Sequence, residues 1–254
     1  MNKLKRFRRW LKAPFVRLFG HGKRLLLNAV TPPLERPANP RQIPVIINNF
    51  NRIDCLKQLI SWLESVGMTN IYILDNESTY PPLLEYYKTC PYEVIYLNKN
   101  VGYMALWQTD VFDRFKNDFY IYTDPDVVPV AECPPDFIDF FITVLSSRAD
   151  VKKVGFSLKI DDLPAHNSRK NELIEIESKY WQKQVASGVY DAPIDTTFAL
   201  YRPRAKGDHR TKALRTGPPY TARHLPWYFD PEDLPEEEIF YQRVASDSNS
   251  FQSS

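Results

Sequence analysis

Two aspartates separated by one residue are the clearest candidates for chemistry in this sequence. Asp124 and Asp126 flank Pro125 directly after the apolar segment Phe119–Thr123. Carboxylate oxygens at this spacing can hold a hard divalent cation such as Mn²⁺ or Mg²⁺, and the proline stiffens the turn between them. A cation held there can neutralise a diphosphate and stabilise it as a leaving group. Aspartate and proline are also ordinary turn residues, so the tripeptide alone does not establish a metal site.

Polar side chains also follow two earlier apolar segments. Asp75 and Asn76 come directly after Ile71–Leu74, and Asp75 can accept hydrogen bonds from a ribose or a base unless it merely forms an Asx turn. The segment Ile43–Phe50 ends among amide and guanidinium side chains, namely Asn48, Asn49, Asn51 and Arg52. These groups can bind a base and a phosphate. The alternative for Asn51 is a cap on the helix that follows.

Alternating strand and helix signals predict how these groups are positioned. Apolar, β-branched segments predict four strands, at Ile43–Phe50, Ile71–Leu74, Val94–Leu97 and Phe119–Thr123. Helical spacing between them predicts a helix from Leu56 to Leu63 that Gly67 ends, a short helix at Pro82–Lys88, and a helix face made by Met104, Trp107, Val111 and Phe115. Strands that alternate with helices form a parallel, doubly wound sheet, which binds ligands beyond the carboxyl ends of its strands. Because Asn98–Gly102 follows the third strand, polar residues follow all four.

Four ordered segments resemble the nucleotide-sugar half of GT-A glycosyltransferases, particularly the family-2-like group. They are Pro44–Arg52, Ile73–Ser78, Asn98–Gly102 and Tyr122–Asp126. The resemblance implies a GT-A fold, a Rossmann-like mixed α/β sheet flanked by helices, over residues 43–244. It implies a UDP- or GDP-sugar donor, with Asp75 on the nucleoside and Asp124–Asp126 as the D-x-D motif, whose last aspartate contacts Mn²⁺ or Mg²⁺. The donor-side candidates are Asn49, Asn51, Arg52, Asp75, Asn76, Asn100 and Asp124. Gly102–Ala105 departs from the usual polar run after the glycine.

The C-terminal half offers candidates for the remaining roles. GT-A enzymes often supply a late histidine as a further metal ligand, and the resemblance makes His224 that candidate beside Asp124 and Asp126, although a lone histidine is more often structural. Asp195 precedes a strand predicted at Thr196–Tyr201 and is our preferred catalytic base, with a turn aspartate as the alternative.

Weaker candidates in this half have structural alternatives as well. Asp161–Asp162 is another possible base, and Glu236–Glu238 is either an echo of the family's acidic motif or the start of a helix. Arg215 and Arg223 are candidates for diphosphate contacts or solvated surface arginines. An amphipathic helix is predicted at Glu172–Gln184, and a Pro- and aromatic-rich stretch at Gly217–Pro231.

The charge distribution divides the 254-residue chain. Residues 1–30 contain nine basic residues and no acid, which leaves 24 basic against 31 acidic residues in the remainder. Trp, Phe and Leu lie between these charges near helical spacing, so we expect an amphipathic arm that binds an anionic membrane surface; a targeting peptide or a helix packed on its own domain are the alternatives. A Pro-rich linker at 31–42 and a disordered tail at 245–254 are also predicted. The acidic body argues against nucleic acid as a partner.

Composition limits the functional class. Three scattered cysteines, at 55, 90 and 133, exclude a zinc finger or a disulfide scaffold and favour a reducing compartment. We therefore expect a cytoplasmic, metal-dependent glycosyltransferase at the inner face of the membrane, acting on a glycan or glycolipid acceptor. The sequence lacks the D-x-D-x-T motif of phosphatases with an aspartate nucleophile, since Val128 stands at the threonine position. It also lacks the Gly-rich loop that a nucleotidyltransferase has after its first strand. A non-catalytic, membrane-bound interaction protein on the same fold is the remaining alternative.

Overall fold

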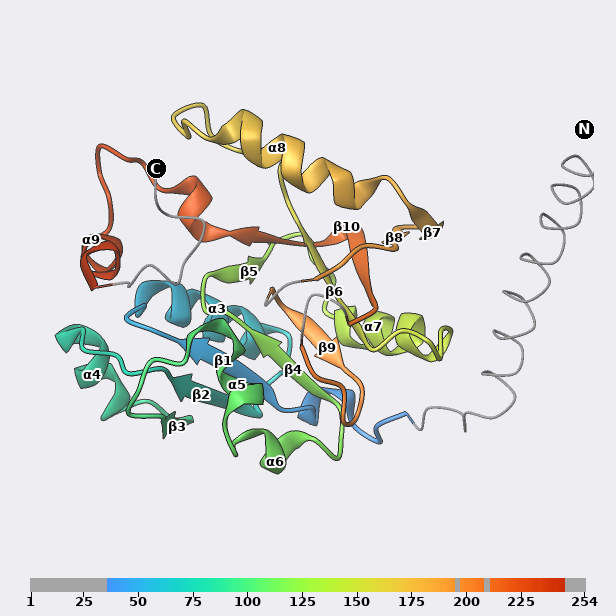
Figure 1. The fold of residues 1–254 in the computed structure, drawn as a ribbon, viewed down its shortest axis with the longest axis horizontal. Coiled ribbons are helices and arrows are strands. Elements are labelled where there is room, and N and C mark those ends of the chain that lie inside the picture. The colour runs from blue at the N-terminus through green and yellow to red at the C-terminus, as the bar shows by residue number, and fades with distance from the viewer. Residues whose placement is uncertain (1–35, 195–196, 208–210, 245–254) are drawn as a thin grey trace, which may run out of the picture.

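A ten-stranded mixed sheet with helices on both faces forms the body of the protein (Figure 1). The computed structural model describes residues 36–194, 197–207 and 211–244. The strand order is β3-β2-β1-β4-β9-β6-β10-β8-β7, and β5 pairs with β10. The predicted fold class, a mixed α/β sheet flanked by helices, is confirmed.

The first half of the sheet is parallel and the second half is mixed. Its strands are β1 (Val45–Asn49), β2 (Ile71–Asp75), β3 (Glu93–Tyr96), β4 (Tyr120–Thr123), β5 (Val127–Pro129), β6 (Lys153–Leu158), β7 (Gln184–Ala186), β8 (Val189–Tyr190), β9 (Ala199–Tyr201) and β10 (Ala213–His224). Strands β1 to β4 run parallel, whereas β9 is antiparallel to both β4 and β6, and β10 is parallel to β6. The carboxyl ends of β1, β2, β4, β6 and β10 therefore share one edge of the sheet, and those of β1, β2 and β10 point to the left of Figure 1.

Strand order reverses between β1 and β4. From β1 the chain proceeds outward to β2 and β3, then returns to place β4 on the other side of β1. At such a switch point the connections leave the sheet in opposite directions, which opens a crevice beyond the carboxyl ends. The segments that follow β1 and β4 are those that carry Arg52 and Asp126.

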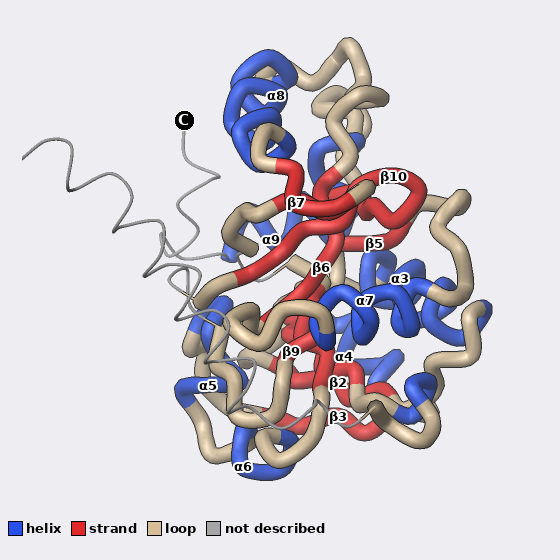
Figure 2. The backbone as a smooth tube through the Cα atoms, turned by 90° about the vertical axis from the view of Figure 1, so that its right-hand side faces the viewer, coloured by secondary structure: helices blue, strands red, loops and turns tan. Residues whose placement is uncertain are grey.

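Two hydrophobic cores cover the two faces of the sheet. The larger core lies under α3 (Asp54–Ser65), α4 (Pro81–Tyr87) and α7 (Phe137–Ser146), and the smaller under α5 (Ala105–Gln108) and α6 (Phe112–Phe115). Figure 2 shows α3 and α7 on one side of the sheet and α5 and α6 toward the other. Because both faces are covered, all five residues of β1 are buried. Helix α3 buries Leu56, Leu59, Ile60 and Leu63 as its spacing predicts, and Gly67 follows its end with φ +79°.

Several predicted elements have different bounds in the structure. The helix face from Met104 to Phe115 is divided into a 3-10 turn (Gly102–Met104), α5 and α6, because Thr109 is extended between the two helices. The helix predicted at Glu172–Gln184 is α8 (Lys170–Ser178), followed by a 3-10 turn (Lys179–Trp181) and β7. The Pro-rich stretch from Gly217 belongs largely to β10, whose pairing with β6 is interrupted between Thr216 and Thr221 and so accommodates the prolines.

The described end of the predicted linker contacts the domain. Residues Pro40–Gln42 form a 3-10 turn capped by Asn39, and Arg41 donates from Nε to the Val66 carbonyl at 3.1 Å. Arg36 pairs with Asp139 on α7. The predicted arm (1–30) and tail (245–254) lie outside the described residues. Within those residues, no helix combines the length and apolar character needed to cross a membrane.

Candidate functional site

Asp126, Arg52 and His224 meet at the switch point. Asp126 lies in the turn between β4 and β5 and is 8% exposed. Its Oδ2 is 3.4 Å from Nε of Arg52 and 3.6 Å from Nε2 of His224, the last residue of β10. The Asp126 carbonyl accepts a hydrogen bond from the Leu225 N–H at 2.8 Å, which fixes this turn against the end of β10. Asp124 lies half-buried at the start of the same turn.

His224 is held in its neutral form. Desolvation by the surrounding protein lowers its pKa; the charge of Asp126 opposes this shift and that of Arg52 reinforces it. Its Nδ1 is buried and has no hydrogen-bond partner among the described residues. A neutral imidazole beside a carboxylate has the lone pair that a transition metal ion requires of a ligand.

Arg52 is enclosed by acidic and aromatic side chains. It is 2% exposed, its Nη1 donates to Oε2 of Glu238, and its guanidinium lies 4.0 Å from the centre of the Tyr241 ring. Burial acts to lower the pKa of Arg52, but Asp126 and Glu238 outweigh it and raise the pKa, so the side chain stays charged. Arg52, which the sequence suggested as a phosphate-binding side chain, is therefore paired with the carboxylates of Asp126 and Glu238.

The acidic residues of α9 (Glu236–Val244) extend this cluster. Glu237 accepts hydrogen bonds from the backbone N–H groups of Ile53, Asp54 and Cys55 at 2.5, 2.6 and 3.3 Å. The helix-start interpretation of Glu236–Glu238 is confirmed, yet Glu237 and Glu238 are 1% and 2% exposed: Glu237 binds the start of α3, and Glu238 pairs with Arg52. Because α3 has no side-chain cap of its own, Glu237 caps it from 182–184 residues away. In the sequence, only the run of three glutamates at 236–238 hinted at this capping role.

A second network surrounds Asp75. Its Oδ1 accepts from the Ser78 N–H at 3.0 Å, which is the predicted alternative of an Asx turn, and its Oδ2 accepts from the Tyr87 hydroxyl at 3.0 Å. Asn49 donates from Nδ2 to the same hydroxyl at 2.8 Å. Asp75 is 3% exposed, so α4 holds it through Tyr87. Each carboxylate oxygen keeps a further lone pair for a ligand N–H or O–H.

The remaining donor-side asparagines fix loops. Asn51 does not cap α3, contrary to one of our interpretations: its φ is +57°, and its Oδ1 accepts from the N–H groups of Thr79 and Tyr80 at 2.7 and 2.9 Å. A left-handed conformation, which asparagine tolerates, turns the side chain toward this neighbouring loop. Asn76 binds the Val101 N–H and the Gly102 carbonyl, and Asn100 accepts from the Gly102 N–H at 2.9 Å.

Unpaired polar atoms concentrate at the switch point. Among the described residues, eight buried side-chain nitrogen or oxygen atoms have no hydrogen-bond partner. Five of them belong to this edge of the sheet: Asn48 Oδ1, Asn49 Oδ1, Asn51 Nδ2, Asp126 Oδ1 and His224 Nδ1. A buried unpaired polar group costs about 1–3 kcal/mol, and such groups are tolerated where a ligand completes their bonds.

The weaker candidates are used structurally. Arg215 is not a surface residue: it is 4% exposed and pairs with Glu177 of α8 at 2.8 Å. Arg223 and the Tyr228 hydroxyl both donate to Asp162. Burial raises the pKa of Asp162, but these hydrogen bonds outweigh burial and lower it, which makes this carboxylate a poor base. Asp195, the preferred base, lies outside the described residues.

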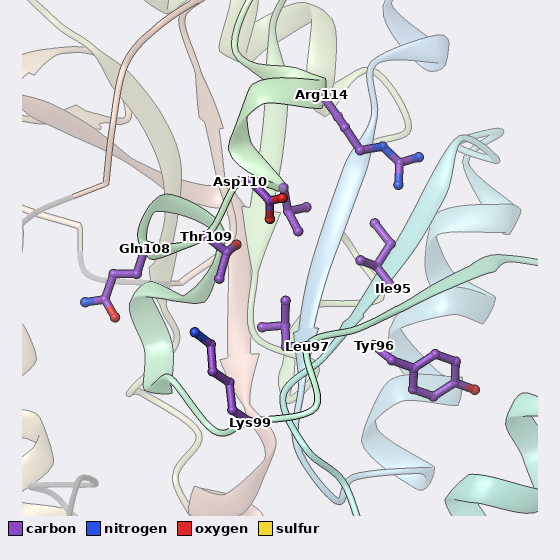
Figure 3. Close-up of a pocket in the computed structure, with 9 residues that line it drawn as sticks. Ile95, Tyr96, Leu97, Lys99, Gln108, Thr109, Asp110 and Arg114 are labelled. Carbon is purple, nitrogen blue, oxygen red and sulfur yellow. The ribbon is translucent and has the colours of Figure 1, made fainter.

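A cavity of about 650 Å³ lies between β3 and α5–α6 (Figure 3). Ile95, Leu97 and Val111 line it together with polar residues such as Lys99 and Arg114. The guanidinium of Arg114 donates two hydrogen bonds to the carboxylate of Glu93, from Nη1 to Oε1 at 2.8 Å and from Nη2 to Oε2 at 2.9 Å. The cavity borders the Asp75 network, because the Leu97 N–H donates to the Asp75 carbonyl at 3.0 Å and the Tyr96 ring lies 6.0 Å from that of Tyr87. Its lining does not include Arg52, Asp126 or His224, so it is not the metal site that the sequence predicts.

Comparison with protein-family models and with curated proteins finds no match. Solved structures are similar at low identity. Glucosyl-3-phosphoglycerate synthase from Mycobacterium tuberculosis, in complex with Mn²⁺ and UDP-glucose, is 14% identical, with a TM-score of 0.43 over 81% of this chain and 80% of that one. The complex of the same synthase with phosphoglyceric acid is 13% identical, with a TM-score of 0.40 over 66% of this chain and 63% of that one. S. aureus TarS gives 14%, a TM-score of 0.36, and coverage of 63% and 47%. These values assign no family, so the function has to follow from the chain's own residues.

Proposed function

We propose that the chain is a metal-dependent glycosyltransferase of the GT-A type that transfers a sugar from a UDP- or GDP-sugar to a hydroxyl acceptor. The observation that carries the proposal is the convergence of Asp126, His224 and Arg52 at the β1/β4 switch point, among five unpaired buried polar atoms. This is the edge at which open α/β sheets bind nucleotides. The ordered D-x-D and Asp75 segments noted in the sequence supply the chemistry expected there.

The residues present fit a divalent cation that is shared with a phosphate. Within the described ranges no three His, Cys, Asp or Glu side chains lie close enough to hold a metal ion by themselves. However, Oδ1 of Asp126 is buried and unpaired, and His224 is a neutral imidazole 3.6 Å from the same carboxylate. Mg²⁺-type ions are commonly held by one or two carboxylates together with substrate phosphates. Asp126 and His224 would hold Mn²⁺ or Mg²⁺ on the protein side, and Asp124 keeps the metal role only as the resemblance to the D-x-D motif implies it.

The other roles follow from position. A bound cation would stabilise negative charge on the departing diphosphate. Asp75, held by Tyr87 and Ser78, and Asn49 would bind the nucleoside, while Asn51, Asn76 and Asn100 shape the loops around it. Asp195, on the segment before β9, remains our candidate for the base that removes the acceptor proton if the anomeric centre is inverted.

The proposal is tested by nucleotide binding. UDP, GDP and their sugar derivatives are added with and without Mn²⁺ to the wild-type chain, to Asp126→Asn, and to Asp118→Asn as a matched control at an exposed aspartate. A ligand at about 100 times its Kd stabilises by about 2.7 kcal/mol, which moves the Tm by several degrees. We expect a Mn²⁺-dependent rise in Tm in wild type and D118N that D126N loses. Absence of any shift in wild type would contradict the proposal and favour a non-catalytic interaction protein.

We also infer that residues 1–30 attach the enzyme to an anionic membrane, at the cytoplasmic face, which suits a glycolipid or surface-glycan acceptor. Nine basic residues interleaved with Trp, Phe and Leu support this inference, since each basic residue near such a surface contributes about 1 kcal/mol. Flotation with anionic vesicles should recover the full chain but not a chain that lacks residues 1–30. Equal recovery of the two chains would contradict membrane attachment by the arm.

A further inference from the structure

We propose that Glu238 is a positioning residue for the metal site: it holds Arg52 away from full pairing with Asp126, so that Asp126 remains available to a divalent cation. This inference rests on the proposed function. The sequence placed Glu238 only in a run that either echoes the family's acidic motif or starts a helix, and neither interpretation gives it this role.

The geometry at Arg52 is asymmetric. Its Nη1 makes a direct hydrogen bond with Oε2 of Glu238, whereas its Nε lies 3.4 Å from Oδ2 of Asp126, an ion pair without a hydrogen bond. Asp126 therefore keeps one oxygen entirely unpaired and the other only loosely engaged. An arginine facing a single carboxylate would instead fork onto both of its oxygens, because that is the strongest arrangement open to it.

Two neighbours hold the pair of Glu238 and Arg52 in place. Gln242, one turn further along α9, donates from Nε2 to Glu238 Oε1 at 3.0 Å, and Tyr241 lies over the guanidinium face of Arg52. Both partners come from α9, which Glu237 attaches to the start of α3. A chain of contacts thus runs from α9 through Arg52 to Asp126.

The charges explain why this arrangement favours a cation. A guanidinium next to a metal ligand repels a divalent cation and competes for the ligand's oxygens. Glu238 neutralises that guanidinium, which leaves the charge of Asp126 for the cation. Partners of this kind that orient and tune a ligand typically change metal affinity by about 10- to 100-fold when they are mutated.

The test uses Glu238→Gln in the full chain. Glutamine keeps the shape and one acceptor oxygen but removes the charge, so Arg52 should turn onto Asp126. With Mn²⁺ as the probe, titrated in the presence of UDP or GDP and followed by EPR of the free ion, we expect E238Q to raise the Kd for Mn²⁺ by about 10- to 100-fold. Glu238→Asp, which restores the charge, should recover most of the affinity.

Two matched controls lie in the same helix turn. Glu236→Gln removes an exposed charge and should leave both the Kd and the Tm at wild-type values. Glu237→Gln weakens the attachment of α9 and should lower the Tm with a smaller change in Kd than E238Q. If E238Q does not fold, Arg52→Lys, which keeps the charge but loses the fork between two carboxylates, should also raise the Kd.

Two results would overturn the inference. One is a Kd for E238Q equal to that of E236Q while wild type binds Mn²⁺. The other is an equal rise in E237Q and E238Q, which would mean that α9 acts only by its attachment. Failure of wild type to bind either Mn²⁺ or nucleotide would instead contradict the proposed function itself.

Discussion

Replacement of Glu237 by alanine should weaken the fold through a helix in the other half of the chain. The carboxylate accepts three N–H groups at the start of α3, at 2.5, 2.6 and 3.3 Å, and is 1% exposed. Hydrogen bonds to a charged group contribute about 1.5–3 kcal/mol, and loss of a cap costs about 0.5–2 kcal/mol. Because one carboxylate serves all three donors, these contributions are not additive, and we expect E237A to lower the free energy of unfolding by about 2–4 kcal/mol.

Urea unfolding followed by circular dichroism measures this loss. Glu236→Ala in the same helix turn controls for helix propensity and for the α9 dipole, and as an exposed substitution it should stay within about 0.5 kcal/mol of wild type. Glu237→Gln keeps an acceptor oxygen without the charge and should fall between E237A and wild type. An E237A protein as stable as E236A would show that α3 does not depend on this cap.

Two further predictions concern buried charges. Arg215→Met leaves Glu177 buried without its partner and should cost about 3–5 kcal/mol in urea unfolding, most of which the double variant R215M/E177M should recover; a single variant that unfolds like wild type would contradict the burial of this pair. The pKa of His224 is lower in the folded chain than its ordinary value of about 6.5. As the pH decreases through that value, the unfolded chain takes up the proton first, so the free energy of unfolding decreases as the pH decreases. Relative to His224→Gln, wild type should therefore lose stability between about pH 7 and pH 5 in metal-free urea titrations, and parallel curves would contradict the shift.

The parallel half of the fold could be predicted from local patterns. Strands β1, β2 and β4 are short, rich in β-branched residues and buried, whereas the edge strand β3 is partly exposed. Polar residues follow all four, so their place and their functional edge follow from the sequence. Helix α3 shows its apolar stripe directly, and Gly67 marks its end. The convergence of Arg52 and Asp126 then follows from the parallel order of β1 and β4.

Long-range contacts explain what could not be predicted. Asn51 has the right residue type to cap α3 but lies two residues before its N-cap, Ile53, and Glu237 on α9 supplies the cap instead. No local pattern links two segments this far apart. Arg215 lies two residues before the predicted Pro- and aromatic-rich stretch at Gly217–Pro231 and was interpreted as a diphosphate contact or a surface arginine, yet its partner Glu177 on α8 holds it in the interior. β10 was obscured by Pro218 and Pro219, which fall where its pairing is interrupted.

The site therefore depends on the whole sheet rather than on any one motif. Arg52 follows β1, Asp126 follows β4, His224 ends β10 and Glu238 lies on α9, so no fragment of the chain brings the four together. A ligand that binds all of them binds only the folded state and stabilises the fold as a unit, by an amount set by its concentration relative to its Kd. Nucleotide and Mn²⁺ should consequently move the unfolding transition of α9 and of the β1–β4 half together. A ligand that protected only one half from hydrogen exchange would be bound elsewhere, for example in the cavity beside β3.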